Sequence, residues 1–235
     1  MILPPWLSDT HLDFPPVEQA LQDPDGLLAV GGDLRCERLI QAYRCGIFPW
    51  YQDDQPILWW SPEQRMALNP EHLNISRSMR KLLRKQKFKV TLDTAFQEVI
   101  EHCAQLREES GTWITLEMQE AYCQLHELGY AHSVEVWEDD TLVGGLYGIS
   151  MGLIFFGESM FSLRDNASKI GFIWFVKQLQ AWHYQLIDCQ VPSDHLRSLG
   201  AEDMPRQQFI KHLERCRDLT GREGHWQMEL EEIAT

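Results

Sequence analysis

The segment HSVEVWEDDTLVGGLYGI, residues 132–149, decides the fold of this chain. Two runs rich in β-branched and apolar residues, 132–137 and 142–149, flank the polar triplet Glu138-Asp139-Asp140. Two such runs around a short polar turn predict a β-hairpin. The run 153–159 predicts a further strand, so we expect a sheet in the middle of the chain.

Periodic segments on both sides of this hairpin predict helices and two more strands. Helices are predicted, from the spacing of apolar residues or from helix start and stop signals, at 74–86, 94–103, 115–129, 167–182 and 205–217. Strand patterns occur at 88–92 and 186–191. Thr94 and Gln97 have the spacing of a capping box. Helices thus alternate with short strands from residue 74 onward, which predicts an α/β or α+β domain with helices around a central sheet.

The first sixty residues differ from the rest. Proline, glycine and aromatic residues dominate them, and the only helical pattern covers 35–44. This composition predicts a small loop-rich unit held together by ring packing. The pairs Ser61-Pro62 and Asn69-Pro70 mark a domain boundary. We therefore expect an N-terminal domain at 1–62 and a second domain at 63–235.

Composition limits the class of protein. The chain has 235 residues, 35 acidic against 21 basic side chains and a formal charge of −14, with 44% hydrophobic residues, which is typical of a globular protein. We expect no signal peptide, and the longest uncharged run, 142–157, is too short for a membrane span. Six scattered cysteines without a CxxC pair indicate reduced thiols in a cytoplasmic protein. His132, His183 and His195 show neither HxxxH spacing nor a carboxylate partner, so no metal site is expected.

One third of the basic side chains lie within residues 77–89, and no acidic residue occurs between Glu71 and Asp93. The cluster consists of Arg77, Arg80, Lys81, Arg84, Lys85, Lys87 and Lys89. A solvated helix face is the simpler interpretation. In a chain this acidic, however, a basic cluster so local favours contact with a polyanion such as a nucleic acid.

Aromatic side chains in the N-terminal unit allow two interpretations. The pairs Trp50-Tyr51 and Trp59-Trp60, and Trp113 in a loop, suit the core of a small unit. One or two of them near a Gly/Pro loop could instead stack on a nucleic-acid base.

The predicted strand 186–191 carries two polar side chains. Because strand side chains alternate, Asp188 and Gln190 share one face, while Ile187, Cys189 and Val191 face apolar packing. A hydrogen-bonded pair at a strand end is the structural interpretation. The functional one is a pair that orients a nucleophile and accepts its proton. Glu158 lies among large apolar groups, either in water at a strand end or as a buried acceptor for an amine.

Several long strings together resemble the leucyl/phenylalanyl-tRNA–protein transferase family. They occur in order at 26–34, 43–50, 60–62 with 65–66, 112–115, 132–137, 157–162 and 187–190. The resemblance covers most of the chain, from about residue 26 to 201. The segment 163–166 matches loosely, and no residue role is carried over there.

The resemblance implies a small N-terminal domain joined to a domain similar to Gcn5-type acetyltransferases. It implies an enzyme that moves Leu or Phe, and also Met, from aminoacyl-tRNA onto proteins with N-terminal Arg or Lys, marking them for N-degron degradation. Four residues match substrate contacts: Trp50 and Trp113 at the 3′-terminal adenosine, and Leu146 and Phe155 in the apolar pocket for the amino-acid side chain. Asp188 and Gln190 match the catalytic pair, and Glu158 matches an acidic residue of the site.

An aminoacyl ester is already activated, so we expect orientation of the amine to matter more than strong catalysis, with no metal or other cofactor. Asp188 would take the proton directly or through Gln190. The basic cluster at Arg77, Arg80, Lys81, Arg84 and Lys85 would contact tRNA, and the protein would act as a monomer. Two rivals remain. An acyl-CoA-dependent acetyltransferase would need a Gly-rich pyrophosphate loop, which the sequence lacks, and a non-catalytic RNA-binding module would need only the basic helix and the tryptophans.

Overall fold

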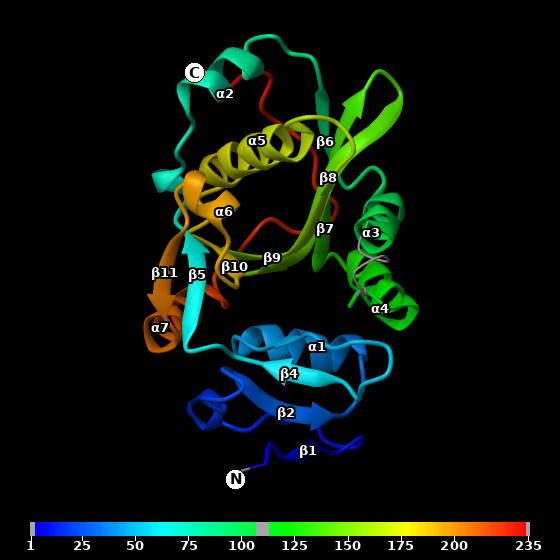
Figure 1. Ribbon diagram of the computed structural model, residues 1–235, viewed down its shortest axis with the longest axis vertical. Coiled ribbons are helices and arrows are strands. Elements are labelled where there is room, and N and C mark those ends of the chain that lie inside the picture. Colours follow the sequence, from blue (N-terminus) through cyan, green and yellow to red (C-terminus); the bar gives the residue numbers. More distant parts are fainter. Residues whose placement is uncertain (1–2, 107–112, 234–235) are drawn as a thin grey trace.

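The computed structural model describes residues 3–106 and 113–233, so Thr112 of the string 112–115 lies outside the described residues. Two sheets organise the chain (Figure 1). The small sheet has the order β1 (Trp6–Leu7), β2 (Leu27–Gly31), β4 (Leu58–Trp60) and β3 (Phe48–Pro49). The large sheet has the order β11 (Glu202–Pro205), β5 (Gln64–Leu68), β10 (Leu186–Gln190), β9 (Ile154–Ser162), β8 (Thr141–Met151), β7 (Ala131–Glu138) and β6 (Lys89–Leu92).

Helices surround the large sheet, as the sequence predicts. They are α1 (Cys36–Arg44), α2 (Arg77–Leu83), α3 (Phe96–Gln105), α4 (Leu116–Glu127), α5 (Ala167–Ala181), α6 (Asp194–Ser198) and α7 (Arg206–Cys216), with short 3₁₀ turns at Val17–Gln19 and Pro70–His72. In Figure 1, α5 lies on one side of strands β7 to β9, and α3 and α4 lie on the other. No helix in the described part of the chain is both long and apolar enough to cross a membrane.

The hairpin of β7 and β8 is confirmed, and its glycines explain how the helices approach the sheet so closely. A Cβ on Gly144 would lie 2.9 Å from the Cβ of Ala167 at the start of α5. A Cβ on Gly145 would lie 2.9 Å from the Phe161 ring and 3.2 Å from Val99 of α3. Side chains at these positions would push the helices off the sheet, so the core depends on both glycines.

The N-terminal unit contains more regular structure than its sequence predicts. Its four strands are two to five residues long, too short for apolar periodicity to reveal. The small sheet ends at Trp60, and the large sheet begins at Gln64. On that basis we propose to keep the division into 1–62 and 63–235.

Three expectations outside the site were wrong. The helix expected at 74–86 is shorter, Arg77–Leu83. The capping box does not form, because the Thr94 hydroxyl donates to Glu135 and Ala95 is the N-cap of α3. From its place at the chain terminus, the segment after Gly224 is expected to be frayed, but Trp226 is 1% exposed and stacks on His132 with ring centroids 3.6 Å apart.

Candidate active site

A largely apolar cleft of about 260 Å³ lies between the N-terminal unit and the large sheet. Its lining comes from β3 and the residue after it, from β8, from β9 and β10, and from helices α5 and α6. It brings together six of the residues singled out from the sequence: Trp50, Trp113, Leu146, Phe155, Glu158 and Gln190. Asp188 is the only residue of the expected catalytic set outside this lining.

The cleft opens where β9 and β10 stop pairing. These parallel strands are in register from Leu186 opposite Ile154 to Asp188 opposite Phe156. Beyond that point β10 shifts register against β5, and Gln190 adopts a left-handed φ of 62°. Bulges of this kind re-aim side chains beside active sites. The bulge is followed by Val191, which is 44% exposed, so the expectation that it packs in the core was wrong.

Glu158 is the acidic group of the cleft. Its Oε1 accepts hydrogen bonds from the Tyr43 hydroxyl at 2.7 Å and from Gln190 Nε2 at 2.8 Å. Its Oε2 accepts from the Tyr122 hydroxyl at 3.2 Å, and the two hydroxyls also contact each other. Burial raises the pKa of Glu158 to about 7, against the opposing effect of these donors. The carboxylate is therefore poised to exchange a proton at neutral pH.

The tyrosines act as fixed donors. Tyr43 of α1 and Tyr122 of α4 are each 0% exposed, and burial raises the pKa of both phenols well above 10, with the charge of Glu158 adding to the effect. Both hydroxyls thus stay protonated and hold the carboxylate in one orientation. Sequence reasoning missed these two residues, since they come from helices 79 positions apart and no local pattern joins them.

Asp188 forms a buried ion pair with Arg65 beside the cleft. Arg65 Nε donates to both carboxylate oxygens, at 2.9 and 3.1 Å, and its Nη2 donates to Oδ2 at 2.6 Å. Asp188 Oδ1 also accepts the backbone N–H of Gln190 at 2.9 Å. Direct transfer of an amine proton to Asp188 has no support in this geometry, because Asp188 does not line the cleft and the cation Arg65 holds both of its oxygens. Its contact with Gln190 suits a positioning role.

Two tryptophans form the aromatic part of the cleft. Trp50 is 47% exposed, and its backbone carbonyl accepts the indole N–H of Trp60. Trp113 also lines the cleft and is partly buried. Trp59, by contrast, is fully buried and packs edge-on against Phe14, as expected for core. Only Trp50 and Trp113 of these four therefore offer a stacking surface inside the cleft.

The basic cluster lies apart from the cleft. All five residues expected to contact tRNA lie on or just after α2 and are exposed: Arg77, Arg80, Lys81, Arg84 and Lys85. Figure 1 shows α2 at the far end of the molecule from α1 and the small sheet. The cleft lining includes residues of the small sheet and the large sheet and none of α2. A ligand that contacts both regions must be large.

One expectation about histidines was wrong. His132 does have a carboxylate partner, since its Nδ1 lies 2.8 Å from Asp93 Oδ2. The sequence hid this pair because 39 positions separate its members. No group of three or more metal-ligating side chains was found in the cleft among the described residues; the group that was found includes Asp93 and lies elsewhere.

An apolar cleft that ends in a buried carboxylate with a pKa near neutrality is typical of the active site of an enzyme. Family models agree with this class and make it specific. A model described as leucyl/phenylalanyl-tRNA protein transferase matches residues 67–214, and one for the N-terminal domain of the same transferase matches residues 32–63. The chain belongs to this family.

Curated relatives of the same description are similar over nearly their whole length. The chain is 59% identical to a leucyl/phenylalanyl-tRNA–protein transferase of Pseudomonas syringae pv. tomato over 88% of this chain and 91% of that one. It is 57% identical to the enzyme of that name from Aromatoleum aromaticum over 96% and 95%.

Solved structures are more distant. "The structure of L-PGS from Bacillus licheniformis" matches with a TM-score of 0.42 and 9% identity, covering 72% of this chain and 56% of that one. A GCN5-related N-acetyltransferase from Kribbella flavida matches with a TM-score of 0.33 and 13% identity, covering 70% of this chain and 58% of that one. At TM-scores this low, neither likeness bears on function.

Proposed function

We infer that this protein is an aminoacyltransferase that moves Leu, Phe or Met from aminoacyl-tRNA to the N-terminal Arg or Lys of acceptor proteins. The new peptide bond marks those proteins for N-degron degradation. Membership of the family supports the activity. The observation in the molecule that carries the proposal is the position of Glu158 at the end of a cleft lined by Trp50, Trp113, Leu146 and Phe155.

The cleft suits both groups at the aminoacyl end of the donor tRNA, the terminal adenosine and the amino acid attached to it. Trp50 and Trp113 offer ring faces for the 3′-terminal adenine, and base stacking contributes about 1–3 kcal/mol. Leu146 and Phe155, 4% and 1% exposed, form an apolar wall for the side chain of the amino acid. The exposed basic residues on α2 would bind phosphates farther along the tRNA.

Peptide-bond formation needs a neutral amine and an acceptor for one proton. The amine attacks the ester carbonyl carbon, the new C–N bond replaces the bond to the ribose oxygen, and that oxygen leaves protonated. Glu158, with a pKa of about 7, accepts the proton from the attacking amine and passes it to the departing ribose oxygen, which restores the carboxylate. Gln190 holds Glu158 in place through its amide, and Asp188 positions Gln190.

Compartment, acceptor choice and oligomeric state complete the proposal. The described cysteines are free, which agrees with a cytoplasmic protein, where aminoacyl-tRNA is made. A surface with a net charge of −14 favours acceptors whose first residue is cationic. The protein would act as a monomer.

Transfer of radiolabelled leucine from tRNA to a peptide that begins with Arg tests this function. A peptide of the same sequence that begins with Asp is the matched control, and acetyl-CoA replaces the donor in a third reaction. We expect label only in the Arg-initiated peptide. RNA binding without transfer, or acetylation of the peptide, would refute the proposal in favour of one of its two rivals.

A further inference from the structure

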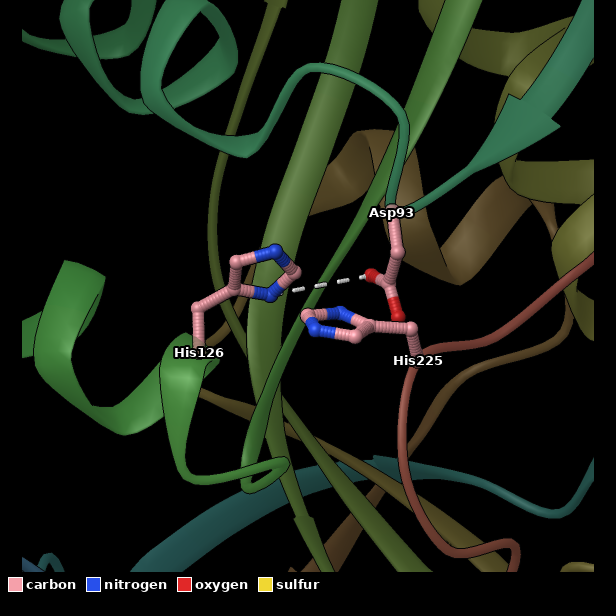
Figure 2. Close-up of side chains that lie close together, drawn as sticks. All are labelled: Asp93, His126 and His225. Carbon is pink, nitrogen blue, oxygen red and sulfur yellow. Dashed lines mark ion pairs between the residues drawn. The ribbon is translucent and has the colours of Figure 1, made fainter.

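Three side chains able to bind a metal ion meet outside the cleft: Asp93, His126 and His225 (Figure 2). Asp93 follows β6, His126 lies in the last turn of α4, and His225 belongs to the segment after α7. One potential ligand atom from each residue lies within 4.8 Å of the others. Figure 2 shows both imidazole rings beside the Asp93 carboxylate.

Asp93 is a buried carboxylate that pairs with imidazoles. Its side chain is 1% exposed, and the ion pairs that it forms within the described residues are with histidines, His132 at 2.8 Å and His126 at 4.0 Å. Oδ2 accepts from His132 Nδ1 and from the backbone N–H of Trp226, and Oδ1 accepts the backbone N–H of Ser133. Oδ1 lies 4.0 Å from His126 Nδ1. A buried anion in this position favours a cation.

The neighbouring groups hold the cluster in place without help from a ligand. The His126 ring stacks on Phe96 with centroids 4.3 Å apart, and its Nδ1 lies 2.8 Å from the Ala131 carbonyl oxygen. His225 precedes Trp226, whose ring is buried against His132. The rings of His126 and His225 are 4.8 Å apart. His225 itself is exposed, so an ion can enter from solvent.

We propose that Asp93, His126 and His225 bind a divalent transition-metal ion, for which Zn²⁺ is the best match. Two imidazoles and one carboxylate are a common ligand set for Zn²⁺. His132 and two backbone N–H groups would orient the ligating carboxylate, as outer groups do around metal ligands. Water would complete the coordination.

Binding requires two small adjustments. With bonds of about 2.1 Å, tetrahedral ligands lie roughly 3.4 Å apart, so the ligand atoms, which lie within 4.8 Å of one another, must draw together by up to about 1.4 Å. The exposed His225 side chain is the freest of the three to move. If His126 ligates through Nδ1, the proton of the neutral ring must lie on Nε2, so the hydrogen bond from Nδ1 to the Ala131 carbonyl is given up. The ion would then clip the C-terminal segment to the end of α4. It has no part in aminoacyl transfer.

Titration of the chelator-stripped full-length protein with Zn²⁺ alone, followed by calorimetry, tests the site. We expect one ion per chain and a rise in Tm of about 5 °C or more when free Zn²⁺ exceeds its Kd a hundredfold. His225→Ala should weaken binding at least tenfold and abolish the rise in Tm. Its Tm without metal should not change, because His225 is exposed.

Two further variants make the test specific. His11→Ala, at an exposed histidine of the N-terminal unit, should bind Zn²⁺ like the wild type. Asp93→Asn keeps the size of the side chain and suits the left-handed φ of 54°, yet should lose the site. Failure of the wild type to bind Zn²⁺, or equal binding by His225→Ala, would overturn the proposal. The cluster would then be a structural network of hydrogen bonds around the Asp93 carboxylate.

Discussion

Arg65 of β5 and Asp188 of β10 form a two-point ion pair between neighbouring strands, with Arg65 1% exposed and Asp188 0% exposed. The guanidinium lies between the rings of Phe48 and Phe209, 4.8 and 4.6 Å from their centroids, and also donates to the Gly46 carbonyl. Through Asp188 Oδ1 this pair holds the backbone of Gln190 at the point where the cleft opens. Stability and positioning of the site therefore depend on the same two side chains.

Asp188→Asn should lower both stability and rate. Leaving Arg65 charged and buried without its partner costs about 3–5 kcal/mol. Loss of the fixed Gln190 should lower the single-turnover rate by roughly 10²–10⁴-fold, with tRNA affinity nearly unchanged. Thermal melts and single-turnover kinetics, at a temperature where the variant is folded, measure the two effects. Normal turnover by folded Asp188→Asn would remove this residue from the mechanism.

A double variant separates the two roles of the pair. Arg65→Met with Asp188→Leu removes both charges together, and such replacements are often neutral for stability. We expect its Tm to recover most of the loss of Asp188→Asn, while the rate stays low because nothing holds the Gln190 N–H. Recovery of rate together with Tm would mean that Asp188 serves the fold alone.

Glu158→Gln should change how stability depends on pH. Because burial raises the folded pKa from 4.5 to about 7, the folded protein favours the protonated form. That contribution is complete below pH 4.5 and is lost as pH rises through 7. Between pH 4.5 and 8 the wild type should therefore lose up to about 3 kcal/mol relative to Glu158→Gln. Melts of both proteins across this range provide the measurement, and parallel curves would contradict the assignment.

The same carboxyl group should shape the pH–rate profile. If ionised Glu158 accepts the amine proton, the single-turnover rate of the wild type rises through an inflection near pH 7. Glu158→Gln should be slower by about 10²-fold or more and should lack that inflection. An unchanged profile in the variant would show that another group, or the substrate itself, takes the proton.

Trp50→Ala and Trp113→Ala should weaken the binding of every donor that carries the terminal adenosine. Losing one stacked ring costs about 1–3 kcal/mol, roughly a 5- to 150-fold rise in KM. The effect should be equal for aminoacyl-tRNA and for a short aminoacyl-adenosine. Trp6→Ala is the matched control, since Trp6 is 72% exposed and does not line the cleft. An equal loss in Trp6→Ala would mean that the effect is not local.

Charge reversal of Arg80 and Arg84 on the basic helix should affect only the long donor. For each tRNA phosphate that the variant no longer binds, the log–log salt slope of tRNA binding should fall by about 0.7–0.9. KM should rise for aminoacyl-tRNA and stay constant for aminoacyl-adenosine. Lys211→Glu combined with Arg215→Glu, at two exposed positions of α7, controls for the same change in net charge. If both donors suffered equally, phosphate binding would not be the cause.

Donor selectivity should follow from the wall formed by Leu146 and Phe155. A rigid wall near the substrate Cβ should admit Leu, Phe and Met and disfavour Ile and Val, with overpacking costing about 1–3 kcal/mol. Leu146→Ala should narrow the preference for Leu over Ile, measured as a ratio of kcat/KM values. Equal transfer of Leu and Ile by the wild type would contradict a rigid wall.

The sequence by itself determined the layout of the larger domain. The hairpin 132–149, the helix that ends at Glu127 shortly before Gly129, and the helix that begins at Ala167 follow from local periodicity and stop signals, which act over a few residues. The resemblance between quoted strings and a known family located Trp50, Trp113, Glu158 and Gln190, which the fold then gathered around one cleft.

Only the tertiary structure decided what these residues contact. Tyr43 and Tyr122 reach Glu158 from two helices, and Arg65 reaches Asp188 across 123 positions. Asp93, His126 and His225 likewise lie close together only because of where the C-terminal segment packs. Periodicity describes which face of an element is buried, but not which distant element covers it. That choice, and with it the pKa of Glu158, is made by the packing of the whole chain.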